Sequence, residues 1–329
     1  MIDPSLLLIQ VAILVLMIIP GFLLAKAHLM PEGSAKAISN LILYAAQVAL
    51  IIAGFCSVDP TKEILIRMLA VFLLAVVSHL MFYGIGLLCY RRAEEAKRRV
   101  LIFSTVFTNA GYMGIPLLVA LFGSTHPEVA VYGSVYVTAF NLFVWSLGAF
   151  LYTEDKKYIS VRKMLLNPAT IATVVGLVIF ALAAIPSVNE HFIVPVVRNP
   201  GGIVTPLLNN FKGMVAPLSM LIIGFRLTEL KLGKALRDKY LYLNIAVSLF
   251  LVPVAVFLLL KLVSVLGIYH DELTASVLMM SASAPAATAT SMFAEKFDGD
   301  SVYAGLIVSI TSILCVATMP IVCALTQLY

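Results

Sequence analysis

A stretch of polar and helix-breaking residues, Thr108 to Leu118, interrupts the apolar run from Val100 to Phe122. Pro116 lacks the N–H group that would bond the carbonyl of Tyr112, so a continuous helix loses one hydrogen bond here. In lipid, irregular backbone is tolerated only where protein packs around it or where it lines a wet cavity. We therefore expect a binding site in this run. Its poor helix formers are Asn109, Gly111, Gly114 and Pro116.

A second apolar run is interrupted in the same way around Pro285, between Ser281 and Thr288. The amide of Asn109 can donate to a carboxylate, and the hydroxyls of Ser281, Ser283 and Thr288 can donate beside the second proline. Two alternatives stay open. Each hydroxyl can bond back to its own helix, and each proline can be a packing kink of the kind that membrane helices tolerate.

The two prolines predict the sign of the ligand's charge. Breaks at Pro116 and Pro285 would create half-helices that begin near Leu117 and Ala286 and face each other. Each helix N-terminus carries roughly half a positive charge and unpaired N–H groups, which favour an anion. None of the 17 Asp and Glu residues lies within an apolar run, and Glu295 comes just past the end of one. A cation exchanger would need such membrane-embedded carboxylates.

Three further polar residues lie inside apolar runs. Gln47 and Asn141 are candidate ligand contacts, with hydrogen bonding between helices as the alternative. His79 falls at the centre of its run and is a candidate for proton coupling. The alternative for His79 is a buried neutral histidine bonded to a neighbour.

The composition indicates an integral membrane protein. Hydrophobic residues make up 61% and charged residues 12% of the 329 residues, against about 45–50% and about 25% in soluble domains. The four cysteines show no CxxC spacing, so we expect neither a disulfide framework nor a metal site, and no cofactor. No basic patch suggests nucleic acid as a partner. The expected partners are the lipid bilayer and a small organic anion.

Ten apolar runs are long enough to cross a bilayer, which needs roughly 17–25 residues. The seventh run contains Lys212 and ends before Arg226, so nine spans with a re-entrant segment remain an alternative. The ten runs are Ser5–Ala25, Ala37–Val58, Met68–Tyr90, Val100–Phe122, Val129–Tyr152, Met164–Ile185, Val204–Phe225, Tyr240–Leu260, Leu273–Ala294 and Ser301–Leu328.

The basic residues predict the orientation. Cytoplasmic loops of membrane proteins collect Lys and Arg, and the loops after the first, third, fifth, seventh and ninth runs hold 17 of the 22 basic residues. Both termini are therefore expected outside, in a multi-pass protein of the plasma membrane, which for a bacterium is the inner membrane.

The two halves of the chain, 1–152 and 153–329, resemble each other. Ser39 to Phe55 aligns with Asn209 to Phe225 without gaps, and both stretches end in Gly-Phe. Nearly the same offset places Pro116 opposite Pro285. Five spans per half make the second half inverted in the membrane. Inverted repeats with interrupted helices at matching positions indicate a secondary transporter with a midplane site. The predicted fold is thus all-α, with ten transmembrane helices in two inverted five-helix repeats and interrupted fourth and ninth spans.

Several motifs resemble the auxin efflux carrier family, which includes the PIN-type carriers of plants, and the resemblance covers nearly the whole chain. The motifs are Asn109-Ala110-Gly111-Tyr112-Met113-Gly114-Ile115-Pro116-Leu117, Asn141-x-x-x-Trp145-x-x-Gly148, Asn167-Pro168, Ala216-Pro217-Leu218, and Pro285 followed by Phe293-Ala294-Glu295-Lys296-Phe297.

The resemblance implies a scaffold of spans one, two, six and seven, a transport part made of the other six spans, and a homodimer. It implies that Asn109 touches the substrate carboxylate. It also implies small carboxylates as substrates, either malate or malonate, as for bacterial relatives, or an auxin-like monocarboxylate.

Residues and resemblance together predict a permease of small organic anions that works by an elevator-type alternating-access motion. A sodium-coupled symporter of the bile acid type is an alternative, with backbone carbonyls at Tyr112 and Ser281 as ion ligands. A non-transporting membrane receptor is another. The spans contain no HExxH, no GxSxG and no carboxylate pair, so an enzyme is not expected.

Overall fold

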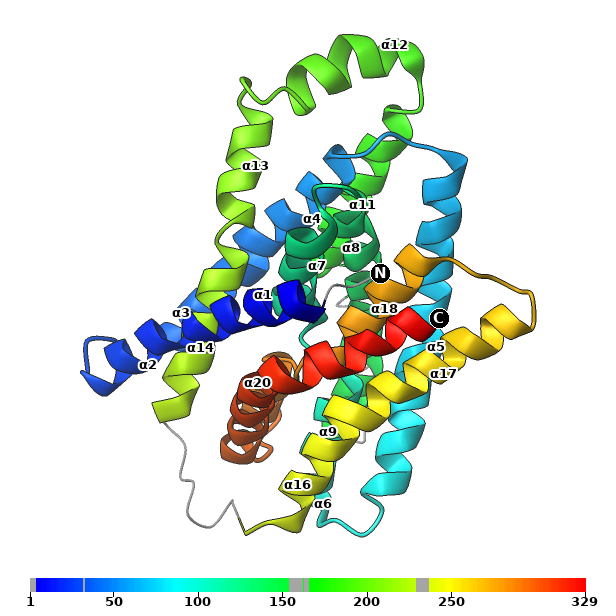
Figure 1. Cartoon of the computed structure of the whole chain (residues 1–329). Helices are drawn as coiled ribbons and strands as arrows, with labels where there is room; N and C mark the ends of the chain where they lie inside the picture. The colour runs from blue at the N-terminus through cyan, green and yellow to red at the C-terminus, as the bar shows by residue number, and fades with distance from the viewer. Residues whose placement is uncertain (1–3, 32, 154–161, 163–165, 229–236) are drawn as a thin grey trace.

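The computed structural model describes residues 4–31, 33–153, 162, 166–228 and 237–329 (Figure 1). These residues form helices and contain no strand beyond one isolated bridge. The expected all-α fold is confirmed. The loops expected to carry Lys156, Lys157, Lys163, Lys231 and Lys234 lie outside the described residues.

The helices of the first half follow the five apolar runs. In chain order they are α1 (Pro4–Leu16), α2 (Ile18–Lys26), α3 (Ser34–Leu41), η1 (Ile42–Ala46), α4 (Gln47–Cys56), α5 (Lys62–Cys89), α6 (Glu95–Val106), η2 (Ala110–Gly114), α7 (Ile115–Phe122), α8 (Val129–Phe143), η3 (Val144–Gly148) and α9 (Ala149–Thr153), where η1 to η3 are π-helical turns.

The second half also follows its apolar runs, except that a helical segment at 186–197 lies between the sixth and the seventh run. Its helices are α11 (Pro168–Leu182), α12 (Pro186–Val188), η5 (Asn189–Val197), α13 (Val204–Lys212), α14 (Val215–Thr228), α16 (Lys239–Ala246), η6 (Val247–Leu251), α17 (Val252–Val265), α18 (Glu272–Ser283), α19 (Ala289–Lys296), α20 (Ser301–Cys323) and η7 (Ala324–Leu328), a final 3-10 turn.

Polar caps explain where several of these helices begin. The side chains of Asn167, Asp238, Asp271 and Asp300 each accept a hydrogen bond from a backbone N–H of the first turn that follows. Such a cap satisfies a donor that has no partner inside the helix.

Seven helices among the described residues are long and apolar enough to cross a membrane, and an eighth is counted if the bent pair α11 and η5 is one span. The two remaining apolar runs, 100–122 and 273–294, are each divided by a non-helical segment into shorter helices. Length and composition alone therefore do not reproduce ten continuous spans.

The first interruption lies at Phe107–Asn109, between α6 and η2, and the predicted break at Pro116 is wrong. Pro116 is the second residue of α7, and the helix runs through it from Ala110 rather than starting near Leu117. Pro116 does not interrupt the helix, because the missing proline N–H falls where the π-helical turn η2 passes into α7. In a π-helix each hydrogen bond spans one residue more than in an α-helix.

The second interruption lies where it was predicted, around Pro285. Helix α18 ends at Ser283 and α19 begins at Ala289, three residues later than the expected Ala286. The alignment of Pro116 with Pro285, however, does not relate the two interruptions. Helices α6 and α18 have 12 residues each and begin at Glu95 and Glu272, and their ends define equivalent breaks.

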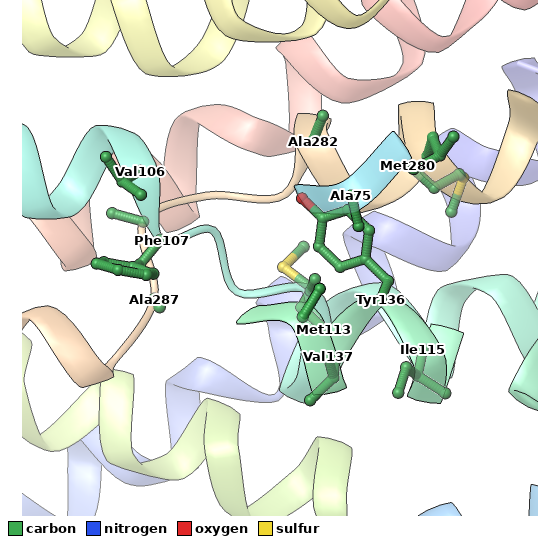
Figure 2. Packing of buried hydrophobic residues seen from close by; sticks show 14 of the residues in the cluster. Ala75, Val106, Phe107, Met113, Ile115, Tyr136, Val137, Met280, Ala282 and Ala287 are labelled. Atoms are coloured by element: carbon green, nitrogen blue, oxygen red, sulfur yellow. The ribbon is translucent and has the colours of Figure 1, made fainter. Parts of the chain in front are cut away.

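The two non-helical segments cross and pair with each other. Thr108 and Ala286 form an antiparallel bridge. The N–H of Asn109 donates to the carbonyl of Pro285 at 2.7 Å, and the N–H of Ala287 donates to the carbonyl of Phe107 at 2.8 Å. Figure 2 shows Phe107 and Ala287 together beside the buried side chains of the crossing. Backbone groups freed by the interruptions are satisfied by one another, as an apolar surrounding requires.

Helices α2 and α14, which are distant in sequence, approach each other closely. A Cβ at Gly21 would lie 2.3 Å from the carbonyl oxygen of Leu221, and one at Gly224 would lie 2.3 Å from that of Ile18. Only glycine permits backbones to pack this closely. The two helices cross on one side of the molecule in Figure 1.

Candidate functional site

A pocket lies at the crossing of the two non-helical segments. The crossing itself supplies one wall and α8 with η3 another, while η1, α4 and α19 complete it. The lining residues are Leu43, Gln47, Thr108, Asn109, Gly111, Tyr112, Val137, Phe140, Asn141, Val144, Trp145, Ala287, Thr288, Ala289, Met292 and Phe293.

Five of the predicted site residues line this pocket: Gln47, Asn109, Gly111, Asn141 and Thr288. Asn109, Gly111 and Thr288 were predicted from the interrupted helices, whereas Gln47 and Asn141 were predicted as polar residues inside apolar runs. The other predicted residues lie outside the lining. They are His79, Gly114, Pro116, Ser281, Ser283 and Pro285.

Two of these residues, Pro285 and Ser281, instead bond the first non-helical segment. The carbonyl of Pro285 accepts the N–H of Asn109, and the carbonyl of Ser281 accepts the hydroxyl of Thr108 at 2.7 Å. The hydroxyl of Ser283 is 3.7 Å from the sulfur of Cys323. Ser281 and Ser283 precede the break on α18 and are buried there without lining the pocket.

Asn109 brings to the lining a buried donor without a hydrogen-bond partner among the described residues. Its side chain is 3% exposed, and no described residue accepts a hydrogen bond from its Nδ2. Its backbone is fixed at both ends, since its carbonyl accepts from the N–H groups of Met113 and Gly114. A buried donor without a partner costs about 1–3 kcal/mol, and a bound acceptor would remove this cost.

Two helix N-termini meet at the same place. The η2–α7 helix begins at Ala110 and α19 begins at Ala289, and neither Asn109 nor Thr288 caps its helix with a side-chain hydrogen bond. The partial positive charge of both helix N-termini gives the pocket a positive potential. The lining, as far as the structure describes the chain, contains no Asp, Glu, Lys, Arg or His. The site is neutral in formal charge and suited to one anionic group.

Gly111 allows the crossing to approach α4. A Cβ at this position would lie 3.2 Å from Nε2 of Gln47 and 3.5 Å from a methyl group of Val137. Glycine thus leaves the backbone at the start of η2 open toward the pocket, with the amide of Gln47 facing it.

Asn141 lines the pocket but differs from Asn109 in its bonding. Its Nδ2 donates to the carbonyl of Val137, one turn back in α8, at 2.9 Å. The predicted alternative for this residue was a bond between helices, and the bond observed is within its own helix.

His79 lies behind the pocket wall, in a box of aromatic rings. Its Nδ1 is 2.7 Å from the carbonyl of Ala75, so the neutral ring donates there, and its Nε2 has no partner among the described residues. The imidazole is stacked on Phe143 with ring centroids 5.3 Å apart. The rings around it are Phe82, Phe107, Tyr136, Phe140 and Phe143.

The carbonyls considered as sodium ligands both have partners in the protein. The carbonyl of Ser281 accepts from Thr108, and that of Tyr112 accepts from the hydroxyl of Ser219 on α14 at 3.4 Å. The described residues also contain no group of three His, Cys, Asp or Glu side chains suited to a metal ion.

Sequence reasoning missed the apolar part of the lining. Val137, Phe140, Val144, Met292 and Phe293 look like any other residues of an apolar helix, because periodicity does not distinguish a pocket wall from a core. Only Trp145 could have been identified as a lining residue, because it is the single tryptophan of the chain and belongs to the motif Asn141-x-x-x-Trp145-x-x-Gly148.

Comparison with known families connects this site to a class of protein. A search of curated proteins returns no match to this sequence. A family described as membrane transport protein matches residues 6–323, which is nearly the entire chain. The matched region includes both interrupted helices and the pocket between them. The chain belongs to this family of membrane transport proteins, the family of the auxin efflux carriers.

Proposed function

We propose that this protein is a secondary permease for small organic carboxylates, which bind in the pocket at the crossing. The observation that carries the proposal is the buried, unpartnered amide of Asn109 beside two helix N-termini. A carboxylate accepts hydrogen bonds from such donors and balances their partial charge.

The pocket favours a monocarboxylate with an apolar body over a dicarboxylate such as malate or malonate. The anion-binding groups gather at one place, and the remaining walls are mainly apolar, including the rings of Phe140, Trp145 and Phe293. A second carboxylate in such walls would lose its hydration without gaining donors, which is costly.

The architecture proposed for transport is ten spans in two inverted repeats, 1–152 and 153–329. Eight spans follow from helix length, counting the bent pair once, and the interrupted helices at 100–122 and 273–294 supply two more. Helices of spans one, two, six and seven form the scaffold, and the other six spans form the transport part. Both termini lie outside the bacterial inner membrane, and the protein works as a homodimer.

The pocket lies between these two parts. Leu43 and Gln47 come from the scaffold, whereas the other lining residues come from the transport part. An elevator-type movement of the transport part carries Asn109 and the bound anion past Gln47. The substrate is then exposed on the opposite side of the membrane without leaving its main donors.

Binding is tested on the purified protein by thermal shift with phenylacetate and with malonate. Charge-assisted hydrogen bonds are worth about 1.5–3 kcal/mol, so Asn109→Ala is expected to weaken phenylacetate binding about 10–100-fold. The matched control is Asn141→Ala, which removes an amide from the same pocket that is already bonded to its own helix. Equal affinity in wild type and Asn109→Ala contradicts the assigned role.

Flux is tested separately, with radiolabelled phenylacetate and proteoliposomes. Uptake that is the same in sodium and choline buffers is expected, because the carbonyls of Tyr112 and Ser281 already have partners. Binding without flux would instead identify a receptor, and strict sodium dependence would identify a symporter.

A further inference from the structure

The single tryptophan of the chain lines the pocket. Trp145 belongs to η3, and the ring of Phe293 on α19 lies 5.2 Å from it, centroid to centroid. The ammonium of Lys296 lies over the indole, 4.9 Å from its centroid. One lining residue of the pocket therefore has a positive charge against its ring.

Lys296 is held beside the indole ring by weak interactions, so its ammonium can move away from the ring. Lys296 is the last residue of α19, where the negative end of the helix dipole favours a cation, and it is exposed. Its ammonium also lies within 5.9 Å of the ring of Phe297. Cation–π contacts at exposed sites are weak enough for an incoming anion to displace.

The pocket itself carries no charged side chain among its described lining residues, so its positive potential comes from helix ends and is short-ranged. An anion approaching from outside the pocket needs a full charge near the opening to raise its rate of encounter. Lys296 lies against the ring of Trp145, which is part of the lining, and supplies that charge.

We propose that Lys296 and Trp145 form an anion-capturing mouth for the pocket. The substrate carboxylate pairs first with the ammonium of Lys296 and draws it off the indole. The freed face of Trp145 then covers the apolar body of the substrate as the carboxylate moves on to Asn109. This inference rests on the proposed function, because it assigns the route by which the anion reaches that site.

The first test needs no knowledge of the substrate. Since Trp145 is the only tryptophan, its fluorescence reports the mouth alone, and iodide and acrylamide serve as an anionic and a neutral quencher. Lys296→Gln is expected to lower the quenching constant of iodide about 2–3-fold, because the local anion concentration falls, and Lys296→Arg is expected to retain it.

Acrylamide quenching serves as the check on folding and should not decrease in Lys296→Gln. The matched control is Lys239→Gln, which removes an ammonium that lies 5.3 Å from the ring of Tyr240 and is not part of the pocket lining. Iodide quenching that is unchanged in Lys296→Gln, or lowered equally in Lys239→Gln, overturns the proposal.

The second test measures the binding of phenylacetate by stopped-flow fluorescence of Trp145. A charge at the rim of a site acts mainly on the association rate and its salt dependence. Lys296→Gln is therefore expected to slow association about 5–10-fold at low salt and to remove most of its dependence on ionic strength. Asn109→Ala is expected to speed dissociation instead.

The two tests separate the two proposals. Lys296-dependent iodide quenching without any phenylacetate response supports the mouth and contradicts the proposed function. Phenylacetate binding with association rates that are identical in wild type and Lys296→Gln supports the function and overturns the mouth.

Discussion

Two asparagines line the same pocket, and their hydrogen bonds distinguish them. Asn141 bonds a carbonyl of its own helix, whereas the amide of Asn109 reaches no acceptor among the described residues. A residue type in a broken apolar run was enough to single out Asn109. Whether a polar side chain is free for a ligand depends on neighbours that only the fold supplies.

His79 offers a prediction at this scale. Nε2 of His79 has no described hydrogen-bond partner, and the ring packs among aromatic side chains with no charged group in contact. Because nothing beside the imidazole would stabilise its charged form, we expect uptake by His79→Gln to keep the pH profile of the wild type between about pH 5 and 8, across the ordinary range of a histidine. Uptake into proteoliposomes at several pH values measures this.

The control for His79 is Asn109→Ala, which should reduce uptake at every pH by the same factor. A pH dependence that is present in the wild type and lost in His79→Gln would establish the proton-coupling role.

At the scale of elements, the interruption of the first crossing helix is set by pairing rather than by proline. The N–H of Asn109 and the carbonyl of Phe107 bond the opposite segment, so the backbone leaves the helix where a partner is available. Pro116 lies further along, inside a helix that η2 adapts to it. Pro116 thus identified the apolar run that is interrupted, but the interruption lies at other residues of that run.

The contact of α2 with α14 gives a prediction about packing. A methyl group at Gly224 would lie 2.3 Å from the carbonyl oxygen of Ile18 and 2.6 Å from the N of Phe22. These are backbone atoms, which cannot move aside alone, and overpacking typically costs about 1–3 kcal/mol. Gly224→Ala should therefore lower the thermal unfolding midpoint of the purified protein.

Gly84→Ala is the matched control, because nothing lies within 4 Å of a Cβ at that position of α5. Alanine is the better helix former by about 0.5–1 kcal/mol, so this variant should unfold at the same or a higher temperature. Equal midpoints for both variants would mean that the two helices separate easily.

At the scale of the whole molecule, an ion pair joins helix starts at each end of the helix bundle. Arg67 of α5 pairs with Asp271, the cap of α18, at 2.8 Å, and Lys97 of α6 pairs with Asp238, the cap of α16, at 2.7 Å. Figure 1 shows these starts at opposite ends of the bundle. Each pair links segments far apart in sequence.

The pair at Asp238 predicts an effect of acid. Burial raises the pKa of Asp238, but hydrogen bonds from Lys97 and from the N–H of Tyr240, with the charge of Lys97, outweigh it and hold the pKa below its ordinary value of 3.8. The folded protein thus binds the proton less readily than the unfolded chain. The stabilisation is complete well above that value and is lost as the pH falls through the lowered pKa.

We expect the wild type to lose about 1 kcal/mol more stability than Asp238→Asn between pH 6 and pH 3. Unfolding midpoints measured across that range check this. Asp59→Asn is the control, since the Asp59 carboxylate is largely exposed in its pair with Arg198, and this variant should lose as much stability as the wild type. A parallel decline in Asp238→Asn would contradict the contribution of the pair.

The sequence by itself determined the class of protein and the position of the residue that we propose as the main ligand contact. Long apolar runs separated by basic loops are typical of helices that cross a membrane. In lipid, the backbone groups freed by an interrupted helix need a hydrogen-bond partner or a water-filled cavity. These are local or compositional properties, so residue types reveal them. Asn109 and the interruption around Pro285 belong to this part.

Only the tertiary structure decided where the first helix breaks and what surrounds the ligand. The hydrogen bonds between Phe107 and Ala287 and the contact of Lys296 with Trp145 join residues that are remote in the chain. Their formation depends on how the helices pack, and neither periodicity nor propensity encodes it. The location of the pocket could be predicted from the sequence, whereas its lining residues and its mouth could be identified only from the fold.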